Sequence, residues 1–110
     1  MKSHVNNYDI FRGEDLKIAD RIQKRRLQIL IHSCIYYNLN KNIISDKEYD
    51  TWSRELQSLQ EAHPTISKQV CWYRAFEGFD ASTGFDLPIN DPWVVNKANY
   101  ILGMYEGKEL

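Results

Sequence analysis

The chain has 110 residues, of which 43% are hydrophobic and 13% aromatic, a composition that fits one compact domain with a modest core. Its 14 Lys and Arg stand against 15 Asp and Glu, so the formal net charge is −1 and no overall field attracts nucleic acid or an anionic membrane. The amino terminus lacks an apolar signal core, and no apolar run approaches membrane-spanning length. We therefore expect a cytoplasmic protein with no direct nucleic-acid or membrane partner.

The cysteines and histidines form no recognisable ligand pattern. Cys34 and Cys71 lack Cys-x-x-Cys spacing, and His4, His32 and His63 are scattered along the chain. The sequence therefore predicts no metal site, no disulfide and no histidine that acts as a catalytic base.

The first predicted element is a long helix that follows a polar arm at residues 1–13. Residues 14–38 contain no Gly or Pro, and their apolar side chains recur at helical spacing. The basic run Lys24-Arg25-Arg26 is typical of a solvated helix face, so we assign it no role. Asparagines between residues 38 and 42 predict the turn that ends this helix, because asparagine tolerates left-handed conformations.

The second helix has the clearest start signal in the chain. Ser45 as the cap and Glu48 three residues later form a capping box, and Asp46 suits the positive end of the helix dipole. His63-Pro64 ends the helix. Its predicted buried stripe, which faces the first helix, is Tyr49, Trp52, Leu56 and Leu59.

Beyond Pro64 the sequence becomes rich in aromatic residues. Residues 68–76 could form a short helix, although their poor periodicity also fits extended structure. An ordered loop is predicted over residues 79–90, and a last helix opens with Asp91 as cap and Pro92 at its first position. The sequence thus predicts an all-α single domain over residues 1–110. It consists of an antiparallel helical hairpin at residues 14–64 and an aromatic-rich extension with short helices at residues 65–110.

An aromatic and acidic corner is expected where the hairpin turns. Asp46, Tyr49 and Asp50 share one side of the second helix's first turn, and Tyr36 and Tyr37 end the preceding helix. Such a corner could hold a planar cation, because tyrosine faces attract cations and carboxylates compensate their charge. The same residues are also typical of the solvated end of a helical hairpin, where acids suit the dipole and tyrosine hydroxyls reach water.

Three segments carry a family resemblance. Tyr36-Tyr37 is followed by Ile-Ser-Asp-Lys-Glu-Tyr-Asp at residues 44–50 and by Arg-Glu-Leu-Gln-Ser-Leu-Gln-Glu-Ala-His-Pro at residues 54–64. In order and spacing they resemble the amino-terminal Ia domain of bacterial NAD-dependent DNA ligases. The resemblance spans residues 27–64, a minority of the chain, and the combination is more specific than a generic amphipathic helix.

This resemblance implies a small helical unit that recognises the nicotinamide mononucleotide half of NAD. The implied cofactor-binding residues are Tyr36, Tyr37, Asp46, Tyr49 and Asp50. Tyr36 and Tyr49 would stack on the ligand and Tyr37 would make a polar contact. Asp46 and Asp50 would supply charge or hydrogen-bond complementarity. In the family, NAD is closed between the Ia and adenylation domains, so a separate unit should bind it more weakly.

The chain also departs from the ligase pattern. Ligation needs a lysine nucleophile in a Lys-x-Asp-Gly motif, which this sequence does not contain, so we expect no catalytic residues and no ligation by this chain alone. Asn40-Lys41-Asn42 replaces the proline that is common in the family's turn. After Pro64 the ligase pattern gives way to the aromatic-rich extension.

Two other functions stay open. The chain could be a repurposed protein-interaction module in which the hairpin is a scaffold and the aromatic-rich extension binds a protein partner, because aromatic residues dominate interface hot spots. A phage or mobile-element inhibitor of a host NAD-using enzyme would be one example. Core packing is the other explanation for these aromatics: Trp72, Tyr73, Phe76, Phe79, Phe85 and Trp93. A remote alternative is hydrolysis of the nicotinamide bond, with Glu48 or Asp50 stabilising an oxocarbenium-like centre.

Overall fold

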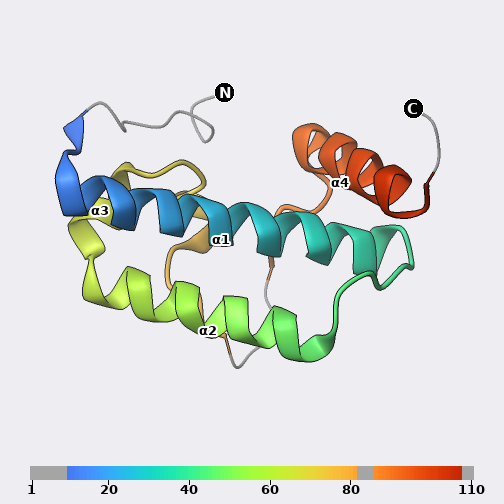
Figure 1. The fold of residues 1–110 in the computed structure, drawn as a ribbon, viewed down its shortest axis with the longest axis horizontal. Helices are drawn as coiled ribbons and strands as arrows, with labels where there is room; N and C mark the ends of the chain where they lie inside the picture. Colours follow the sequence, from blue (N-terminus) through green and yellow to red (C-terminus); the bar gives the residue numbers. More distant parts are fainter. Residues whose placement is uncertain (1–9, 82–85, 108–110) are drawn as a thin grey trace.

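The structure, a computed structural model, describes residues 10–81 and 86–107 and is helical without strands over these ranges (Figure 1). This confirms the all-α prediction. The elements in chain order are α1 (Gly13–Asn38), α2 (Asp46–Ala62), α3 (Pro64–Gln69), the 3-10 helix η3 (Arg74–Phe76) and α4 (Pro92–Tyr105). Among the described residues, no helix combines the length and apolar character that crossing a bilayer requires.

Helices α1 and α2 form the predicted antiparallel hairpin (Figure 1). Asn40 adopts a φ of 56°, and this left-handed residue reverses the chain just after α1, as its sequence predicts. The capping box is also confirmed: the Glu48 amide donates to Ser45 Oγ at 3.0 Å, and the Ser45 amide donates to Glu48 Oε1 at 3.4 Å. Leu56 is fully buried at the centre of the α2 face that packs on α1.

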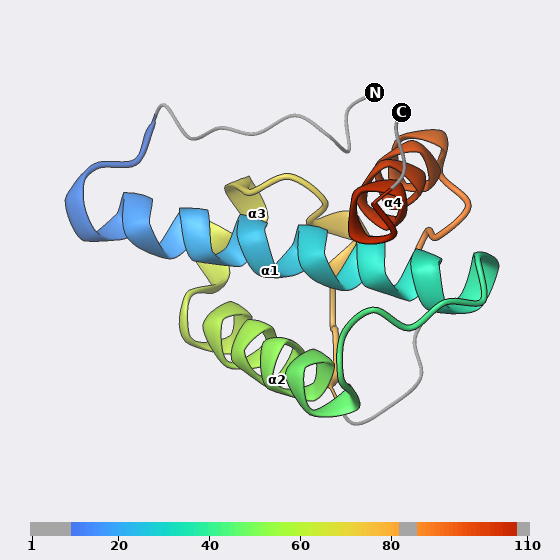
Figure 2. The same ribbon diagram turned by 45° about the vertical axis from the view of Figure 1, so that its right-hand side comes forward.

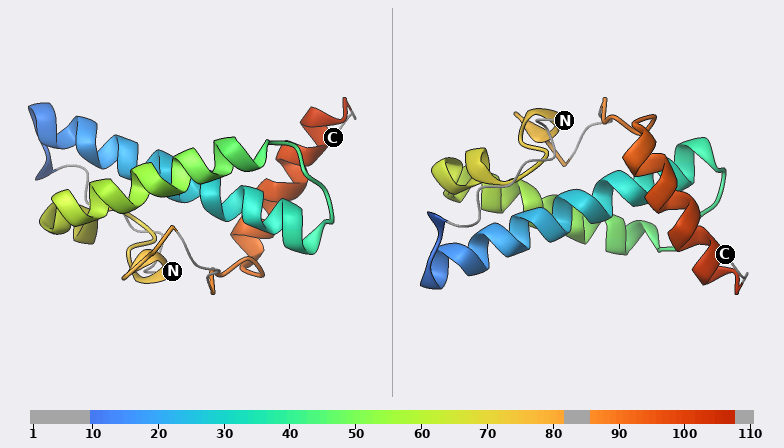
Figure 3. Two further views of the ribbon diagram at one scale, coloured as in Figure 1. Left: turned by 90° about the horizontal axis from the view of Figure 1, so that it is seen from below. Right: turned by 90° about the horizontal axis from the view of Figure 1, so that it is seen from above.

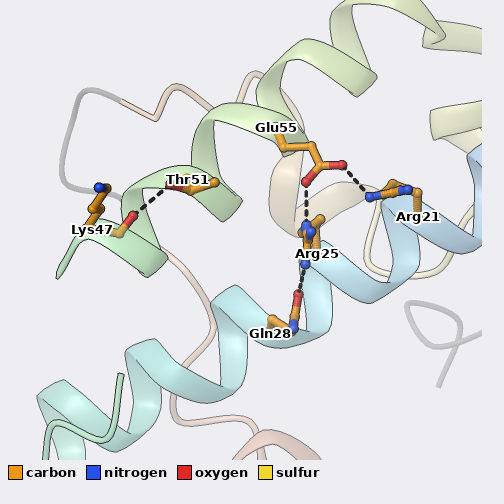
Figure 4. Close-up of polar contacts among 6 residues, drawn as sticks. All are labelled: Arg21, Arg25, Gln28, Lys47, Thr51 and Glu55. Atoms are coloured by element: carbon orange, nitrogen blue, oxygen red, sulfur yellow. Dashed lines mark hydrogen bonds and ion pairs between the residues drawn. The ribbon is translucent and has the colours of Figure 1, made fainter. Parts of the chain in front are cut away.

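Two arginines of α1, Arg21 and Arg25, form ion pairs with the same carboxylate of α2, that of Glu55 (Figure 4). Arg21 Nη1 lies 2.9 Å from Glu55 Oε2, and Arg25 Nε lies 2.8 Å from Glu55 Oε1. Arg25 also donates to Gln28 at 2.6 Å, and its guanidinium carbon lies 5.9 Å from the centre of the Trp52 ring. Arg25 therefore joins the two helices.

Arg26 is completely buried and ties the C-terminal half of the chain to α1. Its guanidinium donates to the carbonyls of Val70 at 2.9 Å, Cys71 at 3.0 Å and Ser67 at 3.2 Å. It also donates to Ser67 Oγ at 2.6 Å and Gln60 Oε1 at 2.9 Å. The prediction of a solvated face is therefore wrong for Arg25 and Arg26. Arg25 reaches Glu55, 30 residues away, and the partners of Arg26 lie 34 to 45 residues away.

The helix predicted over residues 68–76 is wrong in its bounds. Helix α3 begins at Pro64 and stops at Gln69, because Val70 is extended, with φ −92° and ψ 141°. Trp72 then adopts a φ of 69° before η3 begins. This interruption frees the carbonyls of Val70 and Cys71 from helical hydrogen bonding, and Arg26 takes them as acceptors.

Several aromatic side chains of the extension fill the core. Trp72, Phe76 and Phe79 are 3%, 0% and 7% exposed, so core packing explains these three rings and they are unavailable to a partner. Trp93 is 36% exposed, and its ring centre lies 6.0 Å from that of Trp72. Phe85 lies outside the described residues.

Helix α4 covers the side of α1 opposite α2 (Figures 1 and 2). It crosses α1 obliquely and buries Val94 and Ala98 completely (Figure 3). Its start is as predicted, with Pro92 at the first position and Asp91 Oδ1 accepting from the Trp93 amide at 2.9 Å. Asn38, the last residue of α1, donates to the Ile89 carbonyl at 2.9 Å and so joins this region to the hairpin turn.

Candidate functional site

A cavity of about 240 Å³ opens at the turn end of the α1–α2 hairpin. Its walls come from the end of α1, from the turn and from the first residues of α2. The capping box and the left-handed Asn40 fix this corner, because they set where the chain leaves α1 and where it enters α2. The lining residues are His32, Ser33, Tyr36, Tyr37, Asn42, Ile44, Ser45, Asp46 and Tyr49.

Three tyrosines supply the aromatic surface of the cavity, as the sequence predicts. Tyr36 and Tyr37 are 54% and 65% exposed, and their ring centres lie 4.9 Å apart in an edge-to-face arrangement. Tyr49 is more buried, and its hydroxyl lies 2.7 Å from Ser33 Oγ. Burial raises the pKa of Tyr49, although the hydrogen bond with Ser33 acts in the opposite direction. The cavity therefore has an open aromatic rim and one fixed inner tyrosine.

The two predicted acids are placed differently. Asp46 lines the cavity from the first turn of α2. Asp50 is exposed and is not among the lining residues. Its Oδ2 pairs with Arg54 Nε at 2.8 Å one turn further along the helix. The structure therefore brings four of the five residues together at the cavity and places Asp50 outside its lining. A contact between Asp50 and a ligand stays a prediction.

His32 and Ser33 are lining residues that sequence reasoning missed. They lie one turn before Tyr36 and Tyr37 on α1, so the four-residue helical spacing could have placed them on the same wall. The His32 ring packs on Trp52 with a centre-to-centre distance of 5.4 Å. Burial lowers the pKa of His32, and the negative charge of Glu48 opposes this shift. His32 is consequently neutral at neutral pH.

These walls suit a flat ring that carries positive charge. The tyrosine faces attract a cation, and the carboxylate of Asp46 balances its charge. Ser45, Asn42 and Ser33 add polar atoms that can orient such a ligand. Within residues 10–81 and 86–107, no three His, Cys, Asp or Glu side chains gather in a way that could hold a metal ion.

Comparison with known proteins identifies the family. The model of the "DNA ligase-like, N-terminal NAD+-binding domain" matches residues 15–69, which is half of the chain, and the chain belongs to this family. The match contains α1 from residue 15 onward, all of α2 and α3, and every residue that lines the cavity. Helix α4 lies beyond it.

Individual relatives are DNA ligases that are much longer than this chain. The DNA ligase of Bacteroides fragilis is 45% identical over 49 residues, which are 44% of this chain and 7% of the ligase. That of Roseiflexus sp. strain RS-1 is 46% identical over 49 residues, with the same coverage. That of Endomicrobium trichonymphae is 30% identical over 75 residues, which are 68% of this chain and 11% of the ligase. No solved structure matches the chain significantly.

Proposed function

We propose that this chain is a non-catalytic module that binds NAD or nicotinamide mononucleotide through the cavity at the hairpin turn. The observation that carries the proposal is the lining of this cavity by Tyr36, Tyr37, Tyr49 and Asp46 in a member of an NAD+-binding domain family. The nicotinamide ring of both ligands is planar and positively charged in its oxidised form. It therefore matches the chemistry of the walls.

Each wall would have a separate part in binding. The ring would stack against Tyr36 or Tyr49, and a cation–π contact of this kind contributes about 0.5 to 2 kcal/mol depending on its exposure. Tyr37 would offer its hydroxyl at the rim, and Asp46 would balance the charge. A cavity with one open side buries only part of such a ligand, so weak affinity, with a dissociation constant of about 0.1 to 1 mM, is expected.

A non-catalytic role is supported by the chemistry that the residues can perform. The sequence contains no Lys-x-Asp-Gly motif, so a nucleophile of the ligase type is absent from its 110 residues. Glu48, one candidate for stabilising an oxocarbenium-like centre, already accepts a hydrogen bond from the Ser45 amide. Asp50, the other candidate, is paired with Arg54 outside the cavity. Incubation with NAD should therefore release no free nicotinamide.

The proposal is tested by isothermal titration with nicotinamide mononucleotide and with NAD. Tyr36→Leu should weaken binding by about 2- to 30-fold, the factor that corresponds to the loss of one cation–π contact. Tyr100→Leu is the matched control, because Tyr100 is 50% exposed, as Tyr36 is 54% exposed, but lies on α4 away from the cavity. Failure of the unmodified protein to bind either ligand at millimolar concentration would refute the proposal.

The second candidate function is that of a protein-interaction module, for example an inhibitor of a host NAD-using enzyme. The observation that favours it is the exposure of apolar side chains on α4: Trp93, Tyr100, Met104 and Tyr105 are 36%, 50%, 57% and 64% exposed. Residues of this kind are common in interface hot spots. A partner recovered by the unmodified protein and lost by Tyr100→Asp, with ligand binding intact, would support this candidate.

A further inference from the structure

His32 lines the cavity, and the proposed function gives it no part in ligand binding. We propose that His32 makes the cavity sensitive to the charge of the ligand's ring: the neutral imidazole admits a pyridinium cation, and the imidazolium repels it. This inference rests on the proposed function, because it concerns the same cavity. It makes the preference of the cavity for oxidised nicotinamide depend on the protonation state of His32.

The position of His32 is set by two contacts. It lies one turn before Tyr36 on α1, so both side chains line the cavity from the same wall. Its ring packs on Trp52 of α2, with the centres 5.4 Å apart and the planes at 55°. Because the imidazole is held between the two helices, it cannot leave the wall without losing this packing, and its charge acts at a fixed place.

The charged and titratable groups around His32 come from both helices of the hairpin. Asp46, Glu48 and Tyr49 belong to α2, and Tyr36 and Tyr37 belong to α1. Arg25 of α1 lies over the same Trp52 ring on which His32 packs. Glu48 favours the imidazolium, but desolvation has the larger effect, so the pKa of His32 lies below 6.5. The neutral imidazole therefore predominates at neutral pH, and acid creates a positive charge in the wall.

Protonation of His32 and binding of a cation should oppose one another. A protonated His32 in the wall and a cationic ring inside the same partly desolvated cavity repel each other, and a factor of about ten in affinity is a reasonable size for this effect. By linkage, the factor by which protonation of His32 weakens cation binding equals the factor by which a bound cation lowers the proton affinity of His32. A ligand of equal shape with an uncharged ring should not experience this repulsion.

The test compares nicotinamide mononucleotide with benzamide mononucleotide, which has the same ribose phosphate and an uncharged ring. Their affinities are measured above and below the midpoint of the His32 imidazole, which its own NMR titration locates. Because both ligands share the phosphate, its own titration cancels in the ratio of the two affinities. The preference for nicotinamide mononucleotide should fall about tenfold on acidification in the unmodified protein. His32→Gln should remove this change in preference.

A second measurement needs no variant. The NMR titration of the His32 imidazole should show a lower pKa with saturating nicotinamide mononucleotide than with its uncharged analogue. An equal pKa with both ligands, or a preference that changes with pH in His32→Gln as in the unmodified protein, would overturn the inference while leaving the proposed function intact. No binding of nicotinamide mononucleotide at about pH 8 would overturn both.

Discussion

Removal of the Arg26 guanidinium should destabilise the whole fold. Arg26→Met keeps most of the aliphatic stem but removes every donor, so the carbonyls of Ser67, Val70 and Cys71 lose a buried partner. A buried acceptor left without a hydrogen bond costs about 1 to 3 kcal/mol. Water that enters the site can replace part of the lost hydrogen bonding. The total loss of stability for the three carbonyls should therefore lie near the lower end of its range, at about 3 to 5 kcal/mol.

This magnitude is a large share of the stability of a small domain, which is about 5 to 15 kcal/mol. The midpoint of thermal unfolding should therefore fall by more than about 10 °C, measured by circular dichroism at 222 nm. Urea unfolding of the same variant gives the free energy directly. Because Arg26 joins α1 to residues 67–71, the loss should appear as weaker docking of the C-terminal half as well as a lower midpoint.

Arg21→Met is the matched control, because it makes the same substitution on the same helix. The Arg21 side chain is 54% exposed, and its ion pair with Glu55 is solvated. Such pairs contribute about 0 to 1 kcal/mol. Equal losses of stability in the two variants would refute the reasoning that buried carbonyls make Arg26 essential.

Three further outcomes are expected. Ser45→Ala should cost about 1 kcal/mol in urea unfolding, because it removes the cap of α2, and a loss below about 0.3 kcal/mol would contradict this role. His32→Gln should flatten the acid side of the stability profile: neutral His32 stabilises the fold above its unfolded pKa of 6.5, and this contribution disappears as pH falls through the lowered folded pKa. Asp46→Asn should weaken binding of nicotinamide mononucleotide more than Asp50→Asn, since only Asp46 lines the cavity, and the reverse order in calorimetry would restore Asp50 as a contact.

Features set by neighbours in the sequence were predictable. The Ser45 and Glu48 capping box, the left-handed Asn40 and the Asp91-Pro92 start of α4 each depend on a few adjacent residues, and all three are present. The position of the cavity could be predicted from these features. Once the cap and the turn are fixed, helical spacing brings the tyrosine pair and the first turn of α2 together.

Features set by distant partners were not predictable. A basic triplet is usually solvated, and the burial of Arg26 depends on carbonyls 41 to 45 residues further along the chain. The break in the helix predicted over residues 68–76 has the same origin, because the extended Val70 presents its carbonyl to Arg26. Asp50 lies outside the cavity, and its carboxylate pairs with Arg54 one turn along α2.

The central claim is that the hairpin cavity binds a cationic nicotinamide ring, and NMR titration of the tyrosine ring signals tests it most directly. Addition of nicotinamide mononucleotide should shift the signals of Tyr36, Tyr37 and Tyr49 along one saturable curve. The signal of Tyr100 on α4 should stay in place. Unchanged cavity tyrosines at saturating ligand, or shifts confined to Tyr100, would contradict the account.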